Sequence, residues 1–315
     1  MTPGPGGRRG LAGALLGRCL HAACALWVCV TVTFALMHAV PGGPFSSLQL
    51  PAASRALLTA RYGLDRPLLR QYAVYVGNAL HGELGWSLVD PRVTVASMIR
   101  RGLPVSGLLG ALALLWSVPA GLALGLRGAL RPGGPWDRVA GGVALLGLAV
   151  PNFVLAAAAD YFLGVRIRLL PVAGWGTPAQ AVLPALALGA LPLALVARMA
   201  RAQAAEVLRT EYVRAARAKG LSWGQTLRRH VLRNSLLPVL TLLGPLASVT
   251  VAGSFVVETA FAVPGLGAAF VGSILDRDYP LILGLTVFYC ALLLGFNLLA
   301  DLAHLAADPR LDAGL

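Results

Sequence analysis

The chain has 315 residues, of which 57% are hydrophobic and 12% charged, and its formal net charge is +13. This apolar content exceeds what one water-soluble core can bury, so the composition excludes an ordinary soluble domain and favours a bilayer protein. The positive charge alone would also suit nucleic acid. However, no basic platform with interleaved aromatic residues accompanies it, and we predict no nucleic-acid partner.

Six charge-free stretches are long enough to cross about 30 Å of hydrocarbon. They lie within residues 19–40, 104–126, 139–159, 179–197, 235–257 and 281–300. The sequence therefore predicts an all-α integral membrane protein with six transmembrane helices. An even number of spans places both termini on the same side of the membrane.

The distribution of Arg and Lys predicts that both termini are cytoplasmic, because short cytoplasmic loops are enriched in these residues. With the N-terminus inside, the inside segments hold sixteen of them, nine between residues 198 and 233, and the short outside loops hold three. Seven more lie in residues 41–103, a segment long enough to cross regardless of its charge. The first apolar stretch is long for a cleaved signal, so we interpret it as an uncleaved span.

The spans divide the chain into five regions. Leu57, Leu58, Tyr62 and Leu64 form an apolar helical face after the first span, which predicts a helical external segment rather than a linker. The expected regions are a cytoplasmic tail (1–18), the first transmembrane helix (19–40), the external segment (41–103), a five-helix core (104–305) that contains a cytoplasmic loop (198–234), and a cytoplasmic C-terminus (306–315).

Polar and helix-breaking residues inside the spans are the candidates for lining a transport pathway. Pro151, like Pro184 and Pro192, interrupts helical hydrogen bonding, which membranes tolerate where a neighbour or a cavity satisfies the backbone. Asn152 could face a solute or bond a freed carbonyl, and Asp160 could line the pathway or reach the interface. The candidate pathway residues are Pro151, Asn152, Asp160 and Glu258.

Residues 259–275 are uncharged but too short for a further straight span. Pro264, Gly265 and Gly267 interrupt the stretch. We therefore predict an external re-entrant segment or surface hairpin there.

A strongly basic loop lies between the fourth and fifth spans, at residues 211–238. Its alanines favour a helix, and Gly220 is suited to a left-handed C-cap. Ser222 followed by Gln225 is a capping-box pattern, which predicts a second helix from Trp223 to Pro238 with residues 220–222 as the exposed tip. Basic loops in membrane proteins often serve only to orient the chain in the membrane, so the alternative is that this loop is a solvated turn without a partner.

The segments AARAKGLS (215–222) and RHVLRNSLLP (229–238) resemble the cytoplasmic coupling loop of ABC importer permeases that carry dipeptides, oligopeptides or nickel. Further segments resemble that family in the same order, from PGGPF (41–45) to VVETAFAVPGLG (256–267) and DPR (308–310). Two positions depart from the pattern of the wider superfamily: Arg214 replaces the usual Glu, and Arg233 stands where a proline falls.

The resemblance implies a multi-pass permease of the bacterial inner membrane that works by alternating access. Its partners would be a second homologous permease, two cytoplasmic ATP-binding subunits, an external solute-binding protein and membrane lipid. The resemblance implies di- or oligopeptide transport, with nickel or another small solute as the alternative. The loop residues expected to contact the ATPases are Glu211, Arg214, Ala215, Ala216, Lys219, Gly220, Leu221 and Ser222.

The sequence contains no motif for chemistry of its own. A phosphate-binding loop needs Gly-Lys-Ser/Thr, and the one lysine, Lys219, is followed by Gly220. His-Glu-x-x-His, Cys-x-x-Cys and Gly-x-Ser-x-Gly are also absent from the sequence. We therefore expect no catalytic residue, metal ligand or cofactor, and ATP hydrolysis by separate subunits.

Two rival functions remain open from the sequence. An ion-coupled secondary transporter should show paired ionisable groups near the bilayer midplane and related repeats, and neither stands out. A structural or receptor protein would leave solute uptake unchanged when the gene is removed.

Overall fold

The computed structural model describes residues 5–45, 51–252 and 254–307. The ends of the predicted terminal tails, with the DPR segment, lie outside the described residues. The described part is helical, and within it the β contact is limited to one antiparallel bridge between Trp86 and Thr94. The all-α prediction is confirmed.

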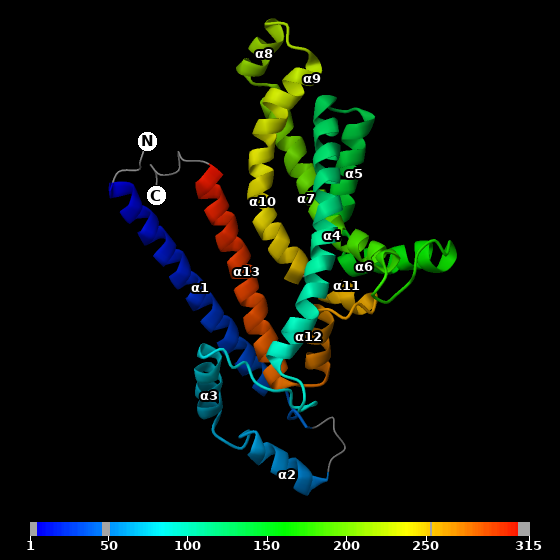
Figure 1. Ribbon diagram of the computed structural model, residues 1–315. Coiled ribbons are helices and arrows are strands. Elements are labelled where there is room, and N and C mark those ends of the chain that lie inside the picture. The colour runs from blue at the N-terminus through cyan, green and yellow to red at the C-terminus, as the bar shows by residue number, and fades with distance from the viewer. Residues whose placement is uncertain (1–4, 46–50, 253, 308–315) are drawn as a thin grey trace. The chain divides into compact units, whose positions relative to one another are not determined.

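The helices follow one another along the chain as shown in Figure 1. In order they are α1 (Pro5–Ala39), α2 (Ala52–Arg61), α3 (Leu68–Leu80), α4 (Val95–Leu130), α5 (Pro135–Ala149), α6 (Asn152–Ala159), the π-helix η1 (Asp160–Arg166), α7 (Pro178–Leu208), α8 (Glu211–Ala218), α9 (Trp223–Thr226), the π-helix η2 (Leu227–Leu232), α10 (Arg233–Ala252), α11 (Phe255–Ala260), α12 (Leu266–Leu275) and α13 (Tyr279–Ala307).

The described residues form two compact units. The first contains the chain up to Pro104 together with Gly265–Gly295. The second contains Val105–Pro264 and Phe296–Ala307. Helices α4 and α13 each contribute residues to both units.

Five helices in the described part are long and apolar enough to cross a membrane. The bent pair formed by α5 and the α6–η1 segment raises the number to six if it counts as one span. The five candidates are Gly17–Ala39, Val95–Leu130, Pro178–Leu208, Leu242–Ala260 and Tyr279–Leu299.

The third predicted span, residues 139–159, is bent rather than straight. Helix α5 ends at Ala149, α6 begins at Asn152, and the two apolar segments meet at 108°. Pro151 lacks an N–H donor and disfavours a helical conformation at Val150, which has an extended ψ of 122°. By contrast, Pro184 and Pro192 lie inside the single helix α7.

The second unit is built around α7, which packs against α5, α6, α10 and α11. Small residues allow these backbones to approach closely. A Cβ atom added at Gly147 of α5 would lie 2.6 Å from Ala194 Cβ and 2.8 Å from the Ala190 carbonyl oxygen of α7. Any side chain at residue 147 would therefore force the two helices apart.

The first unit packs the ends of α1 and α13 against the segment between α1 and α4. Its buried cluster joins Phe34 and Met37 of α1 to Ile282 and Leu283 of α13, and Tyr62 packs against them. The predicted helical character of residues 52–80 is present. Its predicted apolar face differs at one position, because the Leu57 side chain is exposed.

A buried carboxylate ties this segment to the start of α13. Asp278 is 1% exposed and accepts hydrogen bonds from the Ser87 hydroxyl and, at 3.1 Å, from the Leu88 backbone N–H. Neither contact follows from a local sequence pattern, since about 190 positions separate the partners.

The stretch after α11 is too short to cross a membrane, in agreement with the sequence prediction. Ala262 has a positive φ of 50°, and α12 covers only ten residues. A span needs about twenty.

Candidate functional site

Helices α8 and α9 form a small cap at one end of the neighbouring helices α7 and α10 (Figure 1). Helix α8 is amphipathic: Val213 and Ala216 are buried, whereas Glu211, Arg214 and Lys219 beside them are exposed. Val213 belongs to an apolar cluster that includes Ala129 of α4, Ala204 and Val207 of α7, and Val231 of η2. The short helix α8 therefore packs on the long helices α4 and α7 and on the π-helix η2.

The joint after α8 has the geometry that the sequence predicted. The Gly220 N–H donates to Arg217 O at 3.0 Å, and the Leu221 N–H donates to Ala216 O at 3.3 Å. Gly220 has a φ of +85°, a left-handed conformation that favours glycine. No atom lies within 4 Å of the position that a Gly220 Cβ would occupy, so the tip faces open space.

The predicted capping box after the joint is present. The Gln225 N–H donates to Ser222 Oγ at 3.3 Å, and the Ser222 N–H donates to Gln225 Oε1 at 3.0 Å. Of the eight expected loop residues, Ala216 is buried against the chain itself and Leu221 is half-buried. The other six are exposed: Glu211, Arg214, Ala215, Lys219, Gly220 and Ser222.

The second helix does not end at Pro238, and this part of the sequence prediction is wrong. Helix α9 ends at Thr226, the π-helix η2 follows, and α10 runs through both Pro238 and Pro245 to Ala252. Inside an apolar bundle, neighbouring groups and local widening of the helix compensate for the hydrogen bond that a proline removes. Proline is therefore a weaker stop signal here than in water.

Two arginine side chains make contacts beside the joint. Arg214 pairs with Glu211 at 2.9 Å, but both side chains are well exposed, so the pair contributes little stability. The Arg217 guanidinium carbon lies 4.8 Å from the centre of the Trp223 ring and links α8 to α9. A cavity of about 450 Å³ lies beside them, with Arg209 and Leu130 also in its lining.

The candidate pathway residues occupy two places in the second unit. Pro151, Asn152 and Asp160 lie along the segment after the bend, where Pro151 precedes α6, Asn152 begins it and Asp160 begins η1. Asn152 and Asp160 are half-buried. Glu258 lies on α11, a helix that packs against α6.

Glu258 is fully buried and held by hydroxyl groups. Ser106 Oγ of α4 donates to Glu258 Oε1 at 2.7 Å, and Ser254 Oγ donates to the same oxygen at 2.5 Å. Hydrogen bonds to a carboxylate are stronger than neutral ones, and they offset part of the cost of burying it. In this conformation Glu258 ties α4 to α11 and is not open to a solute.

Sequence reasoning missed Ser106, because no pattern connects residue 106 to residue 258. One signal was present in the sequence, the carboxyl group of Glu258 within an apolar stretch, because a buried carboxylate needs hydrogen-bond donors from some other part of the chain. The described residues contain no group of three or more His, Cys, Asp and Glu side chains that could hold a metal ion.

Residues 117–313 match the family model described as the binding-protein-dependent transport system inner membrane component. The chain belongs to this family. The match contains the α8–α9 loop, the bend at Pro151 and Glu258, so each of these features lies in the family's shared region.

Most of the chain is similar to curated relatives. It is 40% identical over 285 residues to the dipeptide transport system permease protein DppB of Lactococcus lactis subsp. cremoris, covering 90% of this chain and 94% of the relative. It is 43% identical over 290 residues to DppB of Bacillus subtilis, covering 92% and 94%. It is 36% identical over 300 residues to the oligopeptide transport system permease protein OppB of Salmonella typhimurium, covering 94% and 98%.

The family membership and the long apolar helices together show that the chain is a multi-pass inner-membrane protein. As an inner-membrane component of a transport system, it is a transport subunit. The resemblance identified from the loop residues is confirmed.

Proposed function

We propose that this chain is the transmembrane permease subunit of an ATP-driven importer of di- and oligopeptides. The printed names of its relatives, dipeptide and oligopeptide permeases at 36–43% identity over most of the chain, support the solute class. The observation that carries the coupling role is the α8–Gly220–α9 joint, which has an exposed, preorganised tip, packs on α7 through Val213 and is connected to α10 through η2.

The partners in this proposal are two cytoplasmic ATP-binding subunits, a second homologous permease and an external solute-binding protein. The ATPases dock on Glu211, Arg214, Lys219 and the Gly220–Ser222 tip. Because Val213 packs on residues of α4, α7 and η2, a displacement of α8 is transmitted to α7 and, through η2, to α10 rather than absorbed in a loose loop.

The proposed topology has both termini in the cytoplasm and residues 41–103 outside. The Arg and Lys distribution supports this orientation, because the basic α8–α9 loop then lies inside. Residues 1–18 and 306–315 are then cytoplasmic, and the core of residues 104–305 forms half of the pathway with the second permease.

In this proposal, alternating access depends on the two regions that contain the candidate pathway residues. The segment after the bend carries Asn152 and Asp160 toward the solute, and the Ser106–Glu258 contact holds α11 in one of two positions. A zwitterionic peptide needs space and a few hydrogen-bonding groups more than a strong fixed charge.

Uptake in a deletion strain tests the solute class. Cells lacking the gene, with and without a plasmid copy, would be given a labelled dipeptide, a labelled tripeptide or radioactive nickel. We expect the plasmid copy to restore peptide accumulation and leave nickel accumulation unchanged. Restoration of nickel uptake alone would contradict the peptide assignment, and unchanged uptake of all three solutes would contradict a transport role for them.

A further inference from the structure

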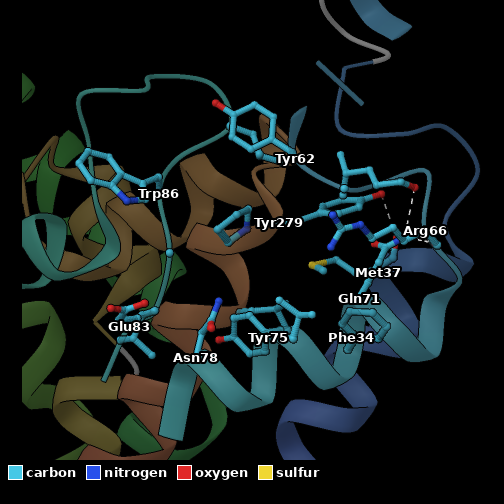
Figure 2. Close-up of a pocket in the computed structure, with 18 of the residues that line it drawn as sticks. Phe34, Met37, Tyr62, Arg66, Gln71, Tyr75, Asn78, Glu83, Trp86 and Tyr279 are labelled. Atoms are coloured by element: carbon cyan, nitrogen blue, oxygen red, sulfur yellow. Dashed lines mark hydrogen bonds between the residues drawn. The ribbon is translucent and has the colours of Figure 1, made fainter. Parts of the chain in front are cut away.

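The first unit contains a cavity of about 590 Å³, a size typical of small-molecule sites. Phe34 and Met37 from the end of α1 and Tyr279 from the start of α13 form part of its wall. Helix α3 contributes Gln71 and Tyr75, among others. Figure 2 shows these side chains around the cavity. The α8–α9 loop and the candidate pathway residues lie in the other unit and take no part in it.

The ends of two candidate spans form part of the cavity wall, so we expect the cavity at the depth where a bilayer changes from hydrocarbon to head groups. Phe34 and Met37 belong to the last two turns of the candidate span Gly17–Ala39, and Tyr279 begins the candidate span Tyr279–Leu299. Tyr72 of α3 makes a 2.6 Å hydrogen bond with Thr31, about 12 Å below the end of α1 at 1.5 Å per residue. Helix α3 therefore reaches into the membrane interface, whichever side of the membrane this unit faces.

The outer face of α3 is suited to lipid. Leu68, Leu69 and Leu80 are 53%, 83% and 82% exposed, although the helix also carries polar residues. An amphipathic helix with this pattern lies in the interfacial plane, with its leucines among acyl chains. We therefore expect lipid beside the helix that forms one wall of the cavity.

The lining of the cavity combines an aromatic wall with an excess of cations. Tyr62, Tyr75, Trp86 and Tyr279 supply flat apolar surfaces and hydroxyl groups, which are typical of membrane interfaces. Three basic residues line the cavity with a single acidic one, Glu83; they are Arg61, Arg66 and Arg70.

A buried donor in the wall also points to an oxygen-bearing ligand. The Tyr75 hydroxyl is shielded from solvent and has no hydrogen-bond partner within the described part of the chain. Burial raises the pKa of this phenol above its usual value, so the group keeps its proton and can donate. An unpaired buried hydroxyl is costly, and a small shift of the Tyr75 ring that opens it to the cavity would let an ester or phosphate oxygen accept its hydrogen bond.

We propose that this cavity binds one anionic phospholipid, with an acyl chain against the aromatic wall and the phosphate beside the arginines. The surplus of guanidinium groups selects a net negative head group over a zwitterionic one. An acidic segment of a partner protein would also complement the charge of the arginines. However, such a segment would not need a cavity whose wall is formed by the ends of two apolar helices. The lipid site is independent of the proposed peptide import and of the orientation of the chain.

Lipid binding to the purified, assembled transporter tests this site. Phosphatidylglycerol or phosphatidylcholine would be added to delipidated complex, and bound lipid would be counted by native mass spectrometry. We expect one tightly retained phosphatidylglycerol and no equivalent phosphatidylcholine. Replacing both Arg66 and Arg70 with Gln should weaken retention by roughly tenfold or more. The control Arg92→Gln removes an exposed arginine from the same segment, outside the cavity lining, and should have no effect.

A second pair of variants distinguishes lipid bound in the cavity from lipid bound non-specifically around the protein. Val74→Trp fills the cavity from its wall and should abolish retention, whereas Leu69→Trp adds the same bulk on the exposed face of α3 and should not. Helix content from circular dichroism would verify that both variants are folded. Equal retention of the two lipids, or retention unchanged by Val74→Trp, would overturn the proposal. Lost affinity for the external binding protein with unchanged lipid would assign the cavity to that protein instead.

Discussion

The Ser106 hydroxyl donates a 2.7 Å hydrogen bond to the Glu258 carboxylate, although 152 positions separate the two residues. Both side chains are fully buried, in a region that also contains the apolar cluster of Leu109, Val257 and Phe261. The contact fixes α11 to α4 at a point where an unpaired carboxylate would be strongly unfavourable.

Removing the Ser106 hydroxyl should destabilise the folded chain. Ser106→Ala takes one donor from a buried carboxylate, and hydrogen bonds to charged groups contribute about 1.5–3 kcal/mol. Thermal or denaturant unfolding in detergent measures the loss. Ser117→Ala is the matched control, since Ser117 is also fully buried on α4, but its hydroxyl has no hydrogen-bond partner within the described residues. Equal stability of the two variants would contradict a role for the contact.

The close approach of α5 to α7 should be intolerant of bulk at residue 147. Gly147→Leu places a side chain where Ala190 and Ala194 already lie, and overpacking of this kind costs about 1–3 kcal/mol. Gly142→Leu changes a residue of the same helix that has open space around it. We expect the first variant to lower the unfolding midpoint and the second to leave it unchanged. A fall of similar size in both would show that the α5–α7 contact is not the cause.

The contact between α1 and α13 can be tested through two native cysteines. Cys29 and Cys290 have their Sγ atoms 2.9 Å apart. A membrane-permeant oxidant that accepts two electrons should therefore join the thiols, with the loss of two protons. Intact mass and the joined peptides after proteolysis would detect the disulfide. Cys29→Ser leaves Cys24 on the same helix and should abolish cross-linking to Cys290; persistence of the link would refute this packing.

The elements that the sequence predicted well are those set by local chemistry. The left-handed cap at Gly220 and the capping box of Ser222 with Gln225 depend only on neighbouring residues, and both are present. The apolar stretches also predicted long helices, because bilayer thickness fixes the length that is needed.

The elements that the sequence could not predict depend on packing between distant segments. Pro151 interrupts the helix at a 108° bend, whereas Pro192 and Pro238 lie inside continuous helices. The presence of a proline alone therefore does not decide whether a helix is interrupted. The Ser106–Glu258 contact and the cavity beside Tyr75 depend on residues brought together only by the fold.

The proposed orientation predicts opposite accessibility for two exposed residues. In a background without native cysteines, Glu83→Cys should react with a membrane-impermeant maleimide added outside intact cells, and Lys219→Cys should react only after permeabilisation. Both side chains are exposed in the structure, so neither result depends on unfolding. Labelling of both from the same side would refute the arrangement of the spans.

The coupling role of the α8–α9 joint depends on the backbone conformation of its tip. Gly220→Val puts a β-branched side chain at a φ of +85°, which costs on the order of 1 kcal/mol or more and displaces the tip. Gly224→Ala is the matched control, because residue 224 lies in α9, has open space around it and does not have the left-handed conformation of Gly220.

Peptide-stimulated ATP hydrolysis by the assembled transporter, measured for these two variants, tests most directly whether this chain couples an ATPase to transport. We predict that Gly220→Val inserts and assembles normally but loses the stimulation and the uptake of labelled peptide, while Gly224→Ala retains both. Normal stimulation and uptake in the Gly220→Val transporter would contradict the coupling role.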